Sequence, residues 1–191
     1  KDPQAKLQPS NHWLLASLYE FGTTAKRAYD EYNTAAVVRA LESCTDGVSN
    51  WYIRSNRRRF WKSEASEDKL IAYWALFQTI RNAAIIMSPI VPFLTEKIWQ
   101  DCVRGYDKTA PLSVHHSEWP VLPAAWADEK VTAEIDKVRQ VINIAHRLRA
   151  ESGIKVRQPL SVLYALCSDA HKTACQEHVQ AILAELNLKK L

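Results

Sequence analysis

Glycine is scarce in this chain, which has four glycines among 191 residues. They lie far apart, at positions 22, 47, 105 and 153. A loop that cradles nucleotide phosphates needs several glycines within a few positions, because the backbone must approach the phosphates closely. The sequence therefore excludes a glycine-rich phosphate-binding loop. It also shows no nucleophile paired with a base, so a complete small enzyme has little support.

Long apolar runs and closely spaced cysteine pairs are also missing. The longest apolar runs, such as residues 83–87, fall far short of the roughly 20 residues needed to cross a bilayer. No signal-peptide pattern opens the chain, and the four cysteines favour reduced, mostly buried thiols. We expect a soluble, cytoplasmic protein with no membrane partner.

One group of side chains resembles a metal-ligand set: Cys167, His171, Cys175 and His178. On one continuous helix these residues would form a stripe about 16 Å long, at about 1.5 Å per residue. Ligand bonds to zinc are only about 2 Å long, so such a stripe cannot surround one ion. The sequence predicts no metal site.

Carboxylates are absent from residues 49–63, which carry five basic and four aromatic side chains. This segment has a net charge of +5, and residues 137–157 have another +5. Because the whole chain is only +4, the other residues together carry −6. Arginine matches phosphate geometry, and aromatic rings offer stacking surfaces for unpaired bases. The pattern indicates a polyanion-binding face, with RNA as the first partner to consider.

Helical periodicity dominates the first three quarters of the chain. Asn11 is a candidate cap for a first helix, and a second helix is expected from about Thr34. A third runs from Ser66 to Pro89, a fourth from Pro92 to about Gly105, and a fifth from Asp128 to Gly153. Residues 105–126 lack periodicity and predict a long loop that crosses the bundle, held by Trp119 and Trp126. The expected fold is mainly α, an antiparallel bundle of about five helices.

The pattern changes after Gly153. Residues 159–166 indicate a strand, residues 170–186 a helix, and the last residues the start of a second strand. One or two strands do not form a stable sheet alone. We therefore predict a helical-bundle domain over residues 1–153 and, over 154–191, the start of a truncated α+β module.

If residues 48–61 form one helix, Trp51, Arg54, Arg58 and Trp61 lie on one face, with Arg57 beside them. Tyr52, Ile53 and Phe60 then face the bundle. The tryptophans could stack on bases or pack inside the protein, and both alternatives remain open at this point. A different class of function is also open, a helical scaffold whose Trp/Arg face binds an acidic protein partner.

Five segments carry a resemblance to a known family. The run at 49–54 (SNWYIR), followed by 57–61 (RRRFW), resembles the signature of the anticodon-binding domain of isoleucyl-tRNA synthetase, a class I aminoacyl-tRNA synthetase. The other four segments match that family in the same order and cover almost the whole chain: residues 12–18, 88–96, 113–120, and Arg149 with 153–160.

The resemblance implies a parent enzyme that joins isoleucine to its tRNA through an aminoacyl-adenylate, using ATP and Mg²⁺. Its catalytic elements, of the His-Ile-Gly-His and Lys-Met-Ser-Lys-Ser type, are not in this sequence, and its editing domain would also lie upstream. We therefore expect a catalytically inactive fragment without a cofactor of its own. Its implied partners are the anticodon arm of tRNA(Ile) and the remaining domains of the synthetase, and we expect a monomer.

The basic residues form two expected contact sets. In the first set, arginines position the anticodon arm through its backbone, and an amide or indole meets or supports a base: Asn50, Trp51, Arg54, Arg57, Arg58, Arg59 and Trp61. In the second set, tRNA contact and solvated surface are equal alternatives: Arg147, Arg149, Lys155 and Arg157.

Overall fold

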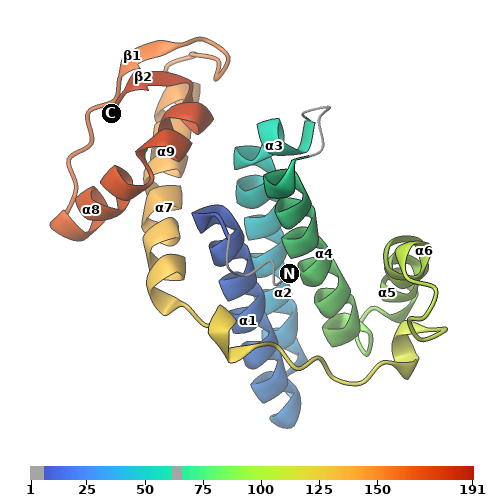
Figure 1. Cartoon of the computed structure of the whole chain (residues 1–191). Helices are drawn as coiled ribbons and strands as arrows, with labels where there is room; N and C mark the ends of the chain where they lie inside the picture. The colour runs from blue at the N-terminus through green and yellow to red at the C-terminus, as the bar shows by residue number, and fades with distance from the viewer. Residues whose placement is uncertain (1–6, 62–65) are drawn as a thin grey trace.

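The computed structural model describes residues 7–61 and 66–191, except for the side chain of Arg58. Helices dominate, in agreement with the mainly α prediction (Figure 1). The elements of the bundle follow in chain order: α1 (Pro9–Asp30), α2 (Thr34–Asp46), the π-helical segment η2 (Gly47–Ile53), α3 (Arg57–Trp61), α4 (Glu67–Met87), α5 (Pro92–Ile98), η3 (Trp99–Val103), α6 (Arg104–Tyr106) and α7 (Glu129–Glu151).

The core of the bundle lies between α1, α2 and α4, with α7 packed along α1 (Figure 1). The apolar stripe of α1 is buried, and Leu14 and Leu18 are fully inaccessible. The caps are local: the Asn33 side chain accepts from the Ala36 amide at 3.1 Å, and Ser66 accepts from the Lys69 amide at 3.2 Å. These caps confirm the predicted starts of the second and third helices.

The predicted cap at Asn11 is wrong. Helix α1 already begins at Pro9, where the missing N–H of proline costs nothing, and Asn11 is a buried residue of its first turns. The Asn11 side-chain oxygen instead accepts the hydroxyl of Tyr52 at 2.9 Å. Burial raises the pKa of this hydroxyl, which therefore stays a hydrogen-bond donor.

Helix α4 is long and apolar enough to span a membrane by length and composition, with a mean hydropathy of 1.3 over its most apolar window. Half of that window is buried inside the protein, where α4 packs on α1 and α5. Burial of this kind is what a core helix of a bundle requires.

The fourth helix differs in detail from the prediction. After α5 the chain continues through η3 and α6, so Gly105 lies inside the last helical turn and does not follow it. Residues 107–128 then cross the lower side of the bundle in Figure 1, with the short 3₁₀ turns η4 (Val114–His116) and η5 (Ala124–Trp126). Trp126 is buried. The rings of Trp119 and Tyr29 pack edge to face, with 5.8 Å between their centroids. Both tryptophans hold the loop, as predicted.

A carboxylate on α5 also fixes this loop. Glu96 accepts from the Ser113 hydroxyl at 2.8 Å and from the Val114 amide at 3.0 Å. Hydrogen bonds from Gln100 and Ser113 hold the pKa of Glu96 below its ordinary value. The loop is thus tied to α5 by an ionised side chain.

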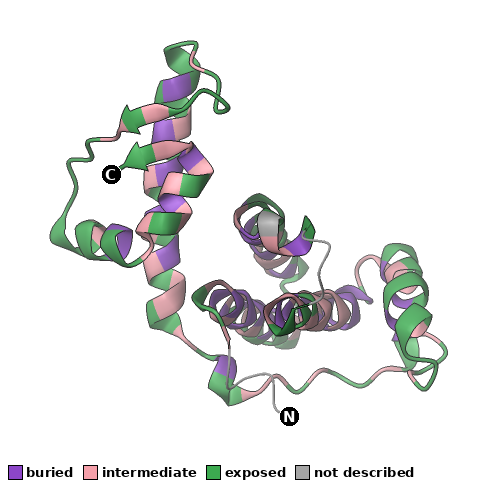
Figure 2. Cartoon of the chain, turned by 45° about the horizontal axis from the view of Figure 1, so that its top comes forward, coloured by how far each residue is buried: buried purple, intermediate pink, exposed green. Residues whose placement is uncertain are grey.

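The last 40 residues form a small α+β unit on α7 (Figure 2). Strand β1 (Leu160–Val162) pairs in parallel with β2 (Leu188–Lys190), with Leu160 opposite Leu188. Helices α8 (Asp169–Glu177) and α9 (Val179–Leu186) connect them and pack on α7. The strand is shorter than predicted, and the expected single helix is broken at His178. A continuous metal-ligand stripe therefore does not form.

Arg149 holds this unit to the end of α7. Its side chain is buried, with 5% exposed, and its guanidinium donates to four carbonyl oxygens. The acceptors are Lys155 at 2.7 Å, Val156 at 3.2 Å, Gln158 at 2.5 Å and Leu186 at 3.3 Å. Gly153, at φ +67°, makes the turn that brings the first three back to Arg149.

Replacing Arg149 tests this role. The change Arg149→Met removes the donor shared by these four carbonyls and empties a buried site, so we expect the free energy of unfolding to fall by about 3 kcal/mol in urea titrations. Arg147→Met, on an exposed residue two positions away, is the control, with a change within about 0.5 kcal/mol. Equal stability of the two variants would contradict the structural role of Arg149.

Candidate nucleic-acid interface

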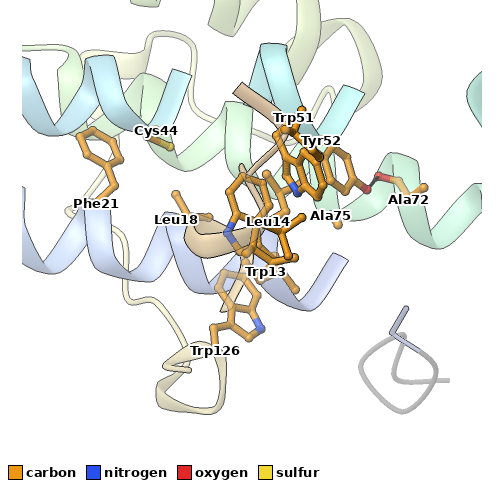
Figure 3. Close-up of a cluster of buried hydrophobic side chains, with 14 of the residues drawn as sticks. Trp13, Leu14, Leu18, Phe21, Cys44, Trp51, Tyr52, Ala72, Ala75 and Trp126 are labelled. Atoms are coloured by element: carbon orange, nitrogen blue, oxygen red, sulfur yellow. Dashed lines mark hydrogen bonds between the residues drawn. The ribbon is translucent and has the colours of Figure 1, made fainter. Parts of the chain in front are cut away.

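The basic aromatic segment, residues 49–61, is not one continuous helix. Residues 47–53 are π-helical, with hydrogen bonds from i to i+5. A turn at Asn56 then separates this segment from helix α3. The wider turn places Trp51 and Tyr52 together in the core, with 4% and 0% exposed, beside Trp13 and Leu14 (Figure 3). Of the two alternatives left open for Trp51, the structure shows packing. The face that Trp51 would share with Arg54 and Trp61 assumed 3.6 residues per turn and does not form.

Arg59 is the centre of a polar network below this segment. Its Nε and Nη2 atoms donate to both carboxylate oxygens of Asp68, at 2.8 and 2.7 Å. Its Nη1 atom donates to Asn56 at 2.7 Å, and to Ser10 and Asn11 at 3.2 Å each. A paired guanidinium of this kind, with 19% of its side chain exposed, holds α1, α3 and α4 together. The donors of Arg59 are used within the protein, which favours a structural role over the predicted tRNA contact.

Arg54 has a different environment. Its Nε forms an ion pair with Glu185 of α9, and 49% of its side chain remains exposed. Glu185 also lies 3.4 Å from Nε2 of His146 on α7, and its own side chain is 8% exposed. Glu185 thus connects the C-terminal unit to the basic segment, and the outer part of the Arg54 guanidinium faces solvent.

Arg57 and Trp61 form the exposed part of the segment. The Arg57 guanidinium lies 5.2 Å from the centre of the Trp61 ring, and 67% of Trp61 is accessible. Within the described part of the chain, no carboxylate pairs with Arg57. This cation–π pair presents a positive charge and a flat ring on the same surface. The Arg58 backbone belongs to α3, and its side chain and Lys62 lie outside the described residues.

The remaining predicted residues are divided between surface and interior. Asn50 is exposed, and its amide donates to Asp46 at 2.6 Å. Lys155 and Arg157 are exposed on the turn after α7. Arg149 is buried, so its predicted tRNA contact is wrong: the carbonyls of that same turn use its donors. Arg147 is exposed and lies 3.9 Å from Glu151.

Sequence reasoning missed the polar residues that hold this surface in place. Asn11, Asn56 and Asp68 are separated by 45 and 12 positions in the chain and meet only around Arg59. Asp68 lies in the first turn of α4, nine positions from Arg59 in the chain. No sequence signal locates such a network.

The cysteine and histidine residues that resembled a metal-ligand set have other neighbours in the structure. His171 faces Gln140 at 3.2 Å and Ser168 at 2.9 Å. His178 lies 3.9 Å from Glu134, and these two with Glu177 keep their ligand atoms within 4.8 Å of one another. Of these three, His178 and Glu134 are mostly buried, with 14% and 17% of their side chains exposed, and Glu177 is exposed.

Comparison with known proteins decides the family. Residues 11–164 match the anticodon-binding domain of tRNA ligase. The chain belongs to this family.

Alignments with isoleucine–tRNA ligases cover almost the whole chain. The chain is 36% identical over 182 residues to the isoleucine–tRNA ligase of Dehalococcoides mccartyi, covering 95% of this chain and 18% of that protein. The identity to the ligase of Thermus thermophilus is 35% over 191 residues, covering 99% of this chain and 18% of that protein. The ligase of Treponema pallidum is 34% identical over 184 residues, covering 96% and 17%. The chain thus spans less than a fifth of the length of these relatives.

Trp51 and Trp61 of the basic aromatic segment distinguish a packed indole from one that is free to contact a partner. Trp51→Ala removes a buried indole, and we expect it to cost about 3 to 5 kcal/mol in thermal or urea unfolding. Trp61→Ala removes an exposed ring and an exposed cation–π pair, so a loss of about 1 kcal/mol or less is expected. A cost for Trp61→Ala as large as that for Trp51→Ala would show that Trp61 packs inside the protein and is not available to a partner.

Proposed function

We propose that this domain is the anticodon-recognition module of an isoleucine–tRNA ligase and holds the anticodon arm of tRNA(Ile). The observation that carries the proposal is the exposed Arg57–Trp61 pair on a segment fixed to the bundle by Arg59. A cation beside a flat ring suits a single-stranded loop, where phosphates and unstacked bases occur together.

We assign each RNA contact to a side chain that the structure leaves exposed. Arg57, with the outer part of Arg54, contacts phosphates and fixes the position of the RNA. Trp61 stacks on a base, a contact worth about 1 to 3 kcal/mol in single-stranded complexes. Lys155 and Arg157 extend the positive surface on the turn after α7. Asn50 is exposed on η2 and offers a side-chain amide to the RNA.

The other chemistry belongs to the rest of the ligase. We assign ATP, Mg²⁺ and the activation of isoleucine to domains outside these residues, since the glycine scarcity of this chain leaves no phosphate-binding loop. By itself the domain is then inactive as a ligase. We infer a cytoplasmic monomer. The alternative function, a scaffold that binds an acidic protein partner, is less favoured, because the chain belongs to a family of anticodon-binding domains.

Binding to anticodon stem-loops tests the proposal directly. We expect the chain to bind the isoleucine stem-loop more tightly than a non-cognate one in gel-shift titrations, with affinity that falls as salt rises. Arg57→Glu replaces an attractive charge by a repulsive one, so its affinity should fall about tenfold or more and its salt dependence should weaken.

Lys108→Glu provides the control for this titration. It makes the same change of charge on an exposed residue of the loop after α6, and we expect less than a threefold effect on affinity. Binding that is independent of salt, or equal effects of the two reversals, would count against RNA recognition by the Arg57–Trp61 pair.

A further inference from the structure

A cavity of about 200 Å³ lies where the two basic segments of the sequence meet. Its walls come from the end of α2, from η2 and the residue after it, from α7, and from Glu185 of α9. Two apolar side chains line it, Trp51 and Ile142. The volume is below the about 300 Å³ at which pockets for drug-sized ligands begin, so it suits one small ring system.

The charges around this cavity are balanced in pairs. Arg139 pairs with Asp46 through Nη2 at 2.5 Å, and Arg54 pairs with Glu185. All four side chains line the cavity. A phosphate placed inside would meet two carboxylates at close range, and a free cation would meet two guanidinium groups. The lining therefore favours a neutral ligand with both donors and acceptors on its edge.

Two side-chain amides on the cavity wall have unused hydrogen-bonding groups. Asn143 of α7 is exposed, and no hydrogen bond to its side chain occurs within the described residues. Asn50 of η2 donates one N–H to Asp46, which leaves its carbonyl oxygen as an acceptor. Side-chain amides form paired hydrogen bonds with the edges of nucleobases.

The rim of the cavity suits an RNA backbone. Arg54 is half exposed there. Arg147 lies one helical turn beyond Asn143 on the same face of α7, with 69% of its side chain accessible. In contrast, a neighbouring groove of about 430 Å³ is lined by the carboxylates of Glu20, Asp128, Glu129 and Asp136, which would repel the RNA backbone.

We propose that the cavity between η2 and α7 receives one unstacked nucleobase of the bound RNA, whose edge is read by the amides of Asn143 and Asn50. The base lies against Trp51 and Ile142, and its phosphates face the rim. This inference rests on the proposed function. It adds a separate site of base recognition on α7, away from Trp61, and it makes the second basic segment part of the RNA surface through Arg147.

The test uses isoleucine anticodon stem-loops that each lack one base of the loop and keep the backbone intact. With the unsubstituted chain, we expect loss of one particular base to weaken binding about tenfold. Asn143→Ala should weaken binding of the intact RNA by a similar factor and show no further loss with that one abasic RNA, because the same contact is already missing. Alanine is favoured in helices, so α7 should remain folded, as circular dichroism can show.

Gln180→Ala provides the control, since it removes an exposed amide from α9 that does not line the cavity. It should bind all the RNAs like the unsubstituted chain. If intact RNA binds but the effects of Asn143→Ala and base removal multiply at every position, the nucleobase site is wrong and the proposed function stands. If no stem-loop binds at all, both are overturned.

Discussion

The bidentate pair between Arg59 and Asp68 is the interaction on which the RNA-facing surface depends. It joins α3 to the start of α4, and the same guanidinium reaches Asn11 and Ser10 on α1 through its other nitrogen. Three helices therefore share one charged group, and the segment before α3 is fixed between them. Bonds between a charged donor and a carboxylate are about twice as strong as neutral ones, and partial burial limits screening by salt. Arg57 and Trp61 belong to the same short helix, α3, so their position depends on this network.

The net charge of a segment differs from the charge it offers to a partner. Residues 49–63 have a formal charge of +5, yet Arg59 is neutralised by Asp68, and Arg54 is paired with Glu185. Within residues 137–157, Arg139 is paired with Asp46, and Arg149 is enclosed by carbonyls. The arginines of each segment thus have two roles, with some holding helices together and others facing solvent. The same residue type performs both because guanidinium forms directed bonds as well as carrying charge.

Much of this arrangement could be predicted from the sequence. Helix periodicity, Ser66 before the third helix, and the prolines of the crossing loop predicted the bundle correctly, because each of these signals is local. The resemblance to the synthetase family was confirmed by the comparison. The sequence left packing and base stacking open for Trp51, and the structure shows packing, since the π-helical turn changes which side chains share a face. The roles of Arg59 and Arg149 could not be predicted, because their partners are distant in sequence or lie on the backbone.

Chemical modification of arginine tests the division between structural and RNA-contacting arginines most directly. The chain is treated with an arginine-specific dicarbonyl reagent, with and without the isoleucine anticodon stem-loop, and each site is quantified by mass spectrometry. Arg57 should react rapidly in the free chain and be protected by RNA, whereas Arg59 and Arg149 should react slowly in both states. Rapid reaction of Arg59 in the free chain, with protection by RNA, would contradict the account.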